Sequence, residues 1–229
     1  MKITTYSGGI LIPKIDTYLD SLNKESSVTC GQRIIRPSGI AGCARAIVYD
    51  ILGIPAKERN TPQTQRIFDN GHGVHHRIEN YLEKMKLFDV LSDGKPAREV
   101  ALSNDEYWIK GTCDGILNIE GMKFILEIKS INTWKYSTLE QPEWYYLDQI
   151  HLYFYCSGIP QGIFLYENKD TQVLREFIIE QDDERLNKLL DKIRFIQDCV
   201  KKGVLPAMDC QDKSKAKYCK YIDHCFPAK

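Results

Sequence analysis

The sequence predicts a mixed α/β domain whose central sheet is flanked by helices. Three observations lead to this fold class. The chain has 229 residues, of which 43% are hydrophobic, so it can bury a core of its own. Segments with helical spacing of apolar residues stand at both ends, and runs with strand character fill the middle. A further helical segment separates the first three strands from the last two, an order that favours a mixed sheet.

The expected helices carry start and stop signals. Ser38 is placed as an N-cap and Gly53 as a stop, while Thr61 with Pro62 begins the next helix. In the last helix, apolar residues at helical spacing predict one buried face formed by Leu186, Leu190, Ile193 and Ile196. The expected helices are 12–24, 38–52, 61–88, 142–158 and 183–203, and the expected strands are 97–103, 107–118, 122–130, 162–167 and 173–180.

Nothing in the sequence marks a membrane or secreted protein. It has no run of about 18 apolar residues, and its first residues lack both an apolar segment of secretory length and a small-residue cleavage site. We therefore expect a cytoplasmic protein without membrane contact. The formal net charge of zero argues against a general electrostatic coat for nucleic acid, but it leaves a local basic groove open.

The expected hairpin at 111–130 contains charged residues among apolar ones. Glu127 and Lys129 are two apart, so they share one face of their strand, and Asp114 on the preceding strand can point the same way. Two close carboxylates repel each other unless one is protonated or a cation lies between them. Oxygen ligands of this kind suit Mg²⁺ or Mn²⁺. A lysine beside the cation can position or deprotonate a water, or stabilise charge on a phosphate.

An E-x-K pair alone carries little information, because 27% of the residues are charged. The pair at 127–129 would also fit a salt bridge on the outer face of an amphipathic strand. A second E-x-K match, at 167–169, lies in a stretch that is expected to be a polar hairpin turn and has no G-x-x-D ahead of it. The apolar setting and the preceding G-x-x-D favour the first pair as a site.

Two helical segments add candidate residues. Gly71 and Gly73 weaken their helix by about 1 kcal/mol each, which predicts close packing or a ligand beside them, and His75 follows Gly71 by four residues. Gln149 and Tyr153 are also four apart, so they share a helix face. Taken singly, these residues would equally fit a surface histidine and an aromatic packing face.

The order G-x-x-x-H, G-x-x-D, apolar E-x-K and Q-x-x-x-Y resembles the RecB-type branch of the PD-(D/E)XK nucleases, from about Arg33 to Cys225. The resemblance implies a restriction-endonuclease-like core. It also implies that Lys129 is catalytic, that Gln149 and Tyr153 support the site or contact DNA, and that His75 is preferred to its neighbours His72 and His76. The metal ligands that it implies are His75, Asp114, Glu127 and Ile128.

The activity implied by this resemblance is that of an Mg²⁺- or Mn²⁺-dependent deoxyribonuclease, an exonuclease on single strands or DNA ends. The implied setting is phage recombination and replication or CRISPR adaptation. The chain has no P-loop motif, so a helicase, like a recombinase or a CRISPR integrase, would be a separate partner. Two alternatives remain: a non-catalytic DNA-binding assembly subunit and a hydrolase of RNA or nucleotides.

Eight cysteines are many for a reducing compartment, where disulfides are rare. Their arrangement resembles the iron–sulfur branch of the same family, which includes CRISPR-adaptation exonucleases, AddB-type subunits and phage nucleases. In that branch one cysteine before the nuclease core and three after it hold a [4Fe–4S] cluster, with a usual C-terminal pattern of C-x₂-C-x₅-C. The implied ligands here are Cys43, Cys210, Cys219 and Cys225.

This chain departs from the usual pattern, because eight residues rather than two separate Cys210 from Cys219. Cys199 and Cys30 are the other candidates, and zinc is an alternative to iron because four thiolates suit both. Cys113 and Cys156 are expected to be packing residues. We expect an N-terminal helical segment with one cluster cysteine (1–60), a nuclease core (61–182) and a C-terminal helix with the cysteine segment (183–229). The cysteines would form an appendage that joins the two helical ends of one compact unit.

Overall fold

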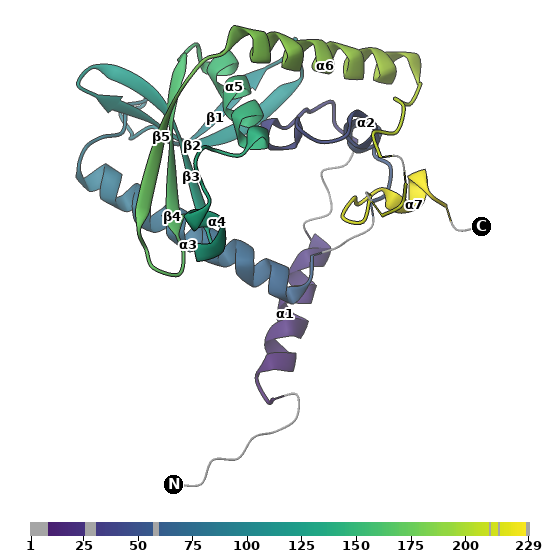
Figure 1. Ribbon diagram of the computed structural model, residues 1–229, viewed down its shortest axis with the longest axis horizontal. Coiled ribbons are helices and arrows are strands. Elements are labelled where there is room, and N and C mark those ends of the chain that lie inside the picture. Colours follow the sequence, from purple (N-terminus) through teal and green to yellow (C-terminus); the bar gives the residue numbers. More distant parts are fainter. Residues whose placement is uncertain (1–8, 26–30, 57–59, 211, 215, 228–229) are drawn as a thin grey trace.

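A computed structural model describes residues 9–25, 31–56, 60–210, 212–214 and 216–227 (Figure 1). Its five strands form one mixed sheet in the order β1-β2-β3-β4-β5. The strands are β1 (Arg98–Asn104), β2 (Ile109–Ile119), β3 (Met122–Ile131), β4 (Gln161–Asn168) and β5 (Leu174–Glu180). Neighbours run antiparallel except β3 and β4, which are parallel. The predicted fold class is therefore confirmed.

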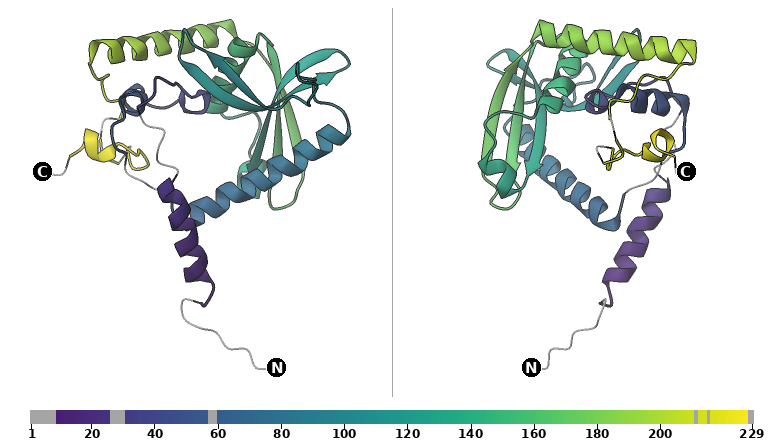
Figure 2. Two further views of the ribbon diagram at one scale, coloured as in Figure 1. Left: turned by 180° about the vertical axis from the view of Figure 1, so that it is seen from behind. Right: turned by 45° about the vertical axis from the view of Figure 1, so that its right-hand side comes forward.

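Helices cover both faces of this sheet. The longer ones are α1 (Ile12–Glu25), α2 (Ala44–Leu52), α3 (Pro62–Lys84), α5 (Trp144–Ser157) and α6 (Asp183–Lys202). Val74 and Ile78 of α3 pack on one face, against Leu126 and Ile128, whereas α5 packs on the other face, against Ile125 and others. Figure 2 shows α3 and α6 on opposite sides of the molecule. The central strands are buried from both sides, and so a charged residue on them needs a partner.

The expected hairpin at 111–130 is present as β2 and β3, which are joined by a tight turn. Glu120 and Gly121 both have positive φ, 52° and 86°, and Ile119 pairs with Met122 across the turn. Two left-handed residues in a two-residue turn match the twist of the strands that they join. This turn sets the register that brings Asp114 beside the E-x-K pair.

Helix boundaries agree with the expectations apart from two corrections. The helix expected over 61–88 ends at Lys84, because Lys86 has a positive φ of 58° and the chain turns there. The expected helix 38–52 is a 3₁₀ turn, η2 (Pro37–Gly39), followed by α2, whose N-cap is Cys43 rather than Ser38. Gly42 N–H donates to the carbonyl of Gly39 and closes a turn there, since glycine disfavours a continuous helix. The stop at Gly53 and the Thr61 N-cap are confirmed.

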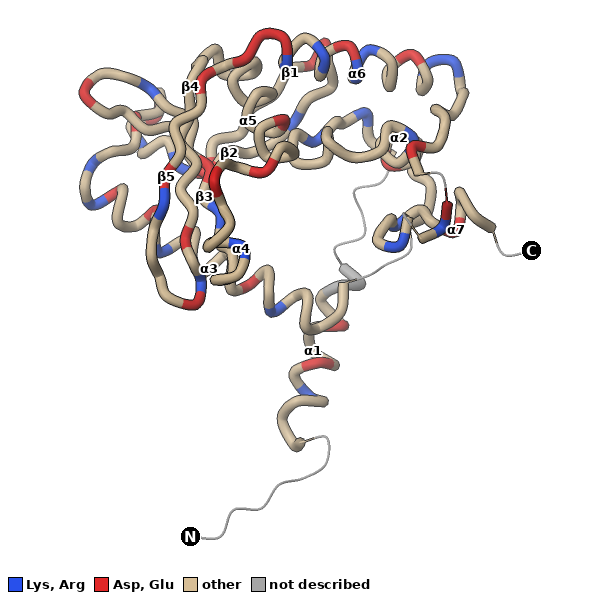
Figure 3. Tube along the Cα trace, viewed as in Figure 1, with Lys and Arg blue, Asp and Glu red and all other residues tan. Residues whose placement is uncertain are grey.

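Two short helices were not expected. They are α4 (Thr133–Ser137), directly after β3, and α7 (Ile222–Cys225) near the C-terminus. The four residues of α6 that were expected to form its buried face are all buried. Within the described residues, no helix combines the length and apolar character needed to cross a membrane. Basic and acidic positions alternate along α6 (Figure 3), in line with the formal net charge of zero.

The expectation of close packing at the α3 glycines is not met. A Cβ at Gly73 would meet nothing within 4 Å, and one at Gly71 would make only an ordinary contact, 3.9 Å, with Ser130 Oγ. Close packing occurs instead at Gly162 of β4, where a Cβ would lie 2.8 Å from the carbonyl oxygen of Ile125 and 2.7 Å from Ile150.

Alanine at Gly162 and alanine at Gly73 should therefore change the free energy of unfolding in opposite directions. Gly162→Ala is expected to lower the free energy of unfolding by about 1–3 kcal/mol, because backbone and core must shift. Gly73→Ala is expected to raise it by about 0.5–1 kcal/mol, because alanine restricts the unfolded chain and favours helix. Urea unfolding of both variants measures the difference, and equal midpoints would contradict the packing described here.

Candidate active site

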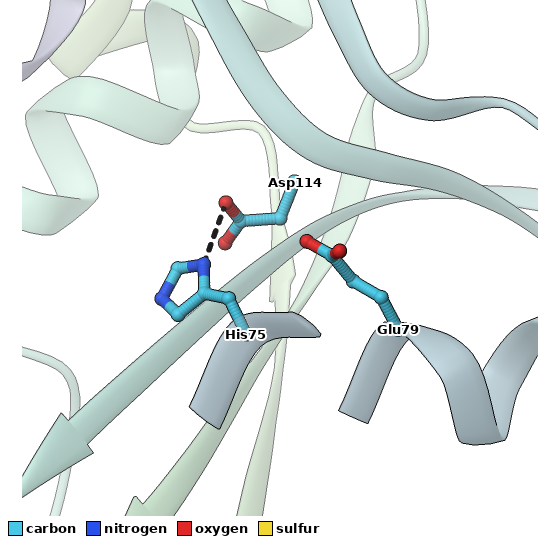
Figure 4. A group of neighbouring side chains, drawn as sticks. All are labelled: His75, Glu79 and Asp114. Atoms are coloured by element: carbon cyan, nitrogen blue, oxygen red, sulfur yellow. Dashed lines mark hydrogen bonds and ion pairs between the residues drawn. The ribbon is translucent and has the colours of Figure 1, made fainter. Parts of the chain in front are cut away.

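His75 and Asp114 meet between α3 and the sheet. His75 Nδ1 lies 3.1 Å from Asp114 Oδ1 (Figure 4). The other carboxylate oxygen of Asp114 accepts a hydrogen bond from the Ile128 N–H at 2.5 Å. The two neighbouring histidines lie elsewhere: His72 is exposed, and His76 lies 3.1 Å from the side-chain amide of Asn80. Of the three, His75 is thus the one that reaches Asp114.

The remaining predicted residues form a second group, which joins β3 to α5. Lys129 Nζ donates to Glu127 Oε2 at 2.6 Å, and Gln149 Nε2 donates to the same oxygen at 3.2 Å. Gln149 also lies 3.2 Å from the Tyr153 hydroxyl, which donates to the Thr112 carbonyl at 2.8 Å. The shared face of Gln149 and Tyr153 therefore turns toward the E-x-K pair.

Burial dominates the electrostatics of this site. Glu127 is 1% exposed, and its burial, with the nearby Asp114 charge, raises its pKa although Lys129 opposes the shift. Burial alone would lower the pKa of Lys129, but the charges of Glu127 and Asp114 outweigh it and raise that pKa. Burial likewise opposes a charged His75, and the bond to Asp114 again raises the pKa. The charges of the His75–Asp114 pair and of the Glu127–Lys129 pair therefore shift one another's pKa values.

Glu79 is a site residue that sequence reasoning missed. It lies four residues after His75 on α3, and its carboxylate points toward Asp114 (Figure 4). One ligand atom from each of Glu79, His75 and Asp114 lies within 4.8 Å of the others. Oε2 accepts from Arg98 Nε at 2.6 Å, whereas the buried Oε1 has no hydrogen-bond partner within the described residues. The H-x-x-x-E spacing on a helix was an available signal.

Glu127 lies outside that three-residue group, because its carboxylate is held on the α5 side by Lys129 and Gln149. Ile128 has a completely buried side chain and makes its contact with Asp114 through the backbone. Any part of Ile128 in metal binding therefore falls to its main chain. Asp114 is the residue that touches both groups.

The second E-x-K match was wrongly expected to lie in a turn. Glu167 and Asn168 belong to β4 and are buried, and the turn begins only at Lys169. Arg77 Nη2 donates to both carboxylate oxygens of Glu167, at 2.7 and 2.9 Å. This glutamate is accordingly one half of an ion pair that fastens α3 to β4.

The four predicted cluster cysteines come together, although Cys43 lies more than 160 residues before the others. Together they line one cavity of about 300 Å³, alongside Tyr49 and other residues. No three of the four sulfur atoms lie within 4.8 Å of one another. Four of the ten residues that line the cavity are thus the predicted ligands Cys43, Cys210, Cys219 and Cys225.

Contacts between α2 and the C-terminal segment hold this cavity. Tyr221 Oη donates to Asp50 at 2.8 Å, its ring lies 5.0 Å from that of Tyr49, and Arg45 Nε donates to the carbonyl of Pro206 at 2.7 Å. The other cysteines lie apart. Cys113 and Cys199 are buried in the core, Cys156 packs against it, and Cys30 lies outside the described residues.

Asp114 lies on β2, and Glu127 and Lys129 lie on the neighbouring strand β3 of the mixed sheet. No family model and no curated protein matches the sequence, but solved structures do. SSO0001 matches with a TM-score of 0.56 and 17% identity, over 98% of this chain and 99% of its own. LHK-Exo, an alkaline exonuclease from Laribacter hongkongensis solved in complex with dAMP, matches with a TM-score of 0.55 and 16% identity. The match covers 77% of this chain and 91% of LHK-Exo.

A phage-related exonuclease from Haemophilus somnus 129PT matches with a TM-score of 0.50 and 13% identity, over 79% of this chain and 97% of its own. At such identities the likeness establishes a shared fold. The two exonucleases match about four fifths of this chain, whereas the SSO0001 match spans nearly all of it.

Proposed function

We propose that the chain is a metal-dependent deoxyribonuclease that hydrolyses phosphodiester bonds, acting as an exonuclease on single strands or DNA ends. One observation carries this proposal: residues predicted from four separate motifs lie in one connected, largely buried site. Exonucleases among the solved structures with this fold support it. An RNA- or nucleotide-directed hydrolase and a non-catalytic DNA-binding subunit are the alternatives that the experiments below separate.

The donor set fits one or two divalent cations. Asp114 and Glu127 offer carboxylates, His75 a ring nitrogen and Ile128 its main-chain carbonyl oxygen, and we add Glu79 because its buried Oε1 has no partner within the described residues. An unpaired buried carboxylate oxygen is costly, and a cation would satisfy it. Mg²⁺ or Mn²⁺ bound here would activate water and neutralise charge at the scissile phosphate.

The protein's own side chains have separate tasks. Lys129 keeps its ammonium group in an ion pair with Glu127, which suits it to stabilise negative charge that develops on the phosphate rather than to accept a proton. Gln149 and Tyr153 orient Glu127 and tie α5 to β2. They therefore position the charged groups and need not touch the substrate.

Substitutions of these two residues should weaken cleavage without abolishing it. Gln149→Ala removes one hydrogen bond to Glu127, and Tyr153→Phe removes the bond to the Thr112 carbonyl, so we expect about a tenfold loss of kcat for each. Steady-state rates on labelled DNA measure the effect. If both variants match the parent protein, this face of α5 serves packing alone.

A direct assay tests the activity. The protein is incubated with end-labelled single- and double-stranded DNA, and with RNA of the same sequence, in Mg²⁺, Mn²⁺ or EDTA. We expect cleavage of DNA that EDTA abolishes, with Mn²⁺ at least as effective as Mg²⁺ because His75 adds a nitrogen ligand. No cleavage in either metal would favour the non-catalytic subunit, and cleavage of RNA alone would favour the other hydrolase.

We further propose that the cysteine cavity holds a [4Fe–4S] cluster. A single tetrahedral zinc ion binds sulfur at about 2.3 Å, which places thiolates about 3.8 Å apart. The cavity of about 300 Å³ has room for a larger group, and the resemblance favours iron. The resemblance also favours an intracellular role in recombination and replication or in CRISPR adaptation, together with a separate helicase, recombinase or integrase.

A further inference from the structure

Two of the chain's three tryptophans are exposed close to the end of β3. Trp134 of α4 is 75% exposed, and Trp144, the first residue of α5, is 60% exposed. Both lie in the connection that leaves β3 just after Lys129 and returns to Gln149. Large exposed aromatic rings beside a site are informative, because tryptophan is highly buried on average.

A row of aromatic rings leads from Trp144 to the lysine of the site. The ring centroids of Trp144 and Tyr145 are 5.8 Å apart, and those of Tyr145 and Tyr146 are 4.4 Å apart. Lys129 Nζ lies 4.5 Å from the centroid of the Tyr146 ring. The rings therefore form a chain of contacts from exposed Trp144, through half-buried Tyr145 and Tyr146, to the lysine that we expect to face the scissile phosphate; Tyr146 itself packs against the core.

On the Trp134 side, cationic groups accompany the aromatic ring. Thr133 fixes α4 to the β4–β5 turn, because its N–H and hydroxyl both donate to Asp170, at 2.7 and 2.9 Å. That turn also carries Lys169, which together with Arg66, Asp170 and the amide side chains of Gln63 and Asn70 lines a polar cavity of about 250 Å³. Arg66 also pairs with Asp16, and Asp170 is held by Thr133, so Lys169 is the lining cation that these contacts leave for a phosphate. Cations and amides of this kind are suited to backbone phosphates.

We infer that Trp134 and Trp144, hereafter the aromatic platform, bind unpaired bases of a single DNA strand as it passes the active site, while Tyr145 and Tyr146 connect Trp144 to Lys129. This inference rests on the proposed function and narrows its substrate. Proteins that bind single strands combine cationic groups along the backbone with aromatic rings on which bases stack. Bases inside a duplex are already stacked on one another, so the platform selects for single strands.

Tryptophan fluorescence tests the platform without cleavage. Oligo(dT) of about 12 nucleotides, enough to span such a surface, is added in EDTA. We expect strong quenching that falls when Trp134→Phe and Trp144→Phe are combined. Trp108→Phe, which removes the third tryptophan, half-buried beside Arg33, is the matched control and should leave the quenching intact.

Affinity measurements complete the test. By anisotropy of labelled DNA, Trp144→Ala and Trp134→Ala should each weaken single-strand binding about 5- to 150-fold, the range for loss of one stacked base. Phe195→Ala, an exposed aromatic of α6, should not change it. A duplex of equal length should bind the parent and the variants alike.

If the tryptophan variants keep the quenching and the affinity of the parent protein, the inference is wrong. If they lose affinity equally for single strand and duplex, the tryptophans contact the DNA backbone and do not stack on bases. Because EDTA prevents cleavage, these outcomes are independent of the proposed activity. A protein that binds oligo(dT) through the platform but never cuts would retain this inference and lose the proposed nuclease.

Discussion

Alanine in place of Asp114, Glu127 or Lys129 is expected to abolish DNA cleavage, by a factor of at least about 10²–10³ in kcat, while the protein stays folded. Asp114 contacts both His75 and the Ile128 N–H, so its loss separates the two halves of the site. Loss of Lys129 leaves the buried Glu127 carboxylate without its cationic partner. Cleavage of end-labelled DNA in Mn²⁺ measures the effect.

Exposed charges of the same sheet supply matched controls. Glu176→Ala on β5 and Lys110→Ala on β2 remove a carboxylate and an ammonium group that face solvent, and both variants should cut at the parent rate. Far-ultraviolet circular dichroism of all five variants checks the fold. Full activity in any one of the three site variants would remove that residue from the mechanism.

Glu79→Gln refines the same experiment. Glutamine keeps the size of the side chain and removes its negative charge, so a loss of affinity for Mn²⁺ would identify Glu79 as a ligand. Glu83→Gln, one turn later on α3 and also within reach of Arg98, is the control. If both variants bind Mn²⁺ with the parent affinity, Glu79 serves only as the partner of Arg98.

Serine at Cys219 or Cys225 should remove the iron–sulfur cluster and destabilise the protein. The cluster would join α2 to the C-terminal segment and close a loop longer than 160 residues between Cys43 and Cys210. A cross-link that closes a loop of about 100 residues contributes roughly 4.7 kcal/mol in the chain-entropy account. The proposed metal ligands all lie within this loop, so activity should fall together with stability.

Protein purified without oxygen should be brown, with broad absorbance at roughly 400 nm and about four irons per chain, as expected for a [4Fe–4S] cluster. The Cys219 and Cys225 variants should be colourless, whereas Cys113→Ser and Cys156→Ser should keep the colour because these residues lie in or against the core. A colourless folded protein with one zinc would retain the four ligands and refute the iron. Freely titratable thiols in a metal-free folded protein would refute the site.

Local patterns determined most of the fold, because helix caps, glycine stops and strand alternation act over a few residues. The Thr61 N-cap, the stops at Gly53 and Gly158 and the Glu120–Gly121 turn all lie where such rules place them. The Ser38 N-cap failed, because Gly42 closes a turn within the span assigned to one helix. Short α4 gave no pattern long enough to recognise.

The sequence by itself also placed His75, Asp114, the E-x-K pair and the Gln149–Tyr153 face in one expected site, because the order of these motifs resembles that of a known nuclease family. Only the tertiary structure decided which atoms meet. It brought Glu79 beside His75, turned the second E-x-K match into a buried ion pair, gathered four distant cysteines around one cavity and left two tryptophans exposed near Lys129. These contacts join residues far apart in the chain, and their distances depend on how α3, α5 and the two ends pack against the sheet, which no short-range pattern specifies.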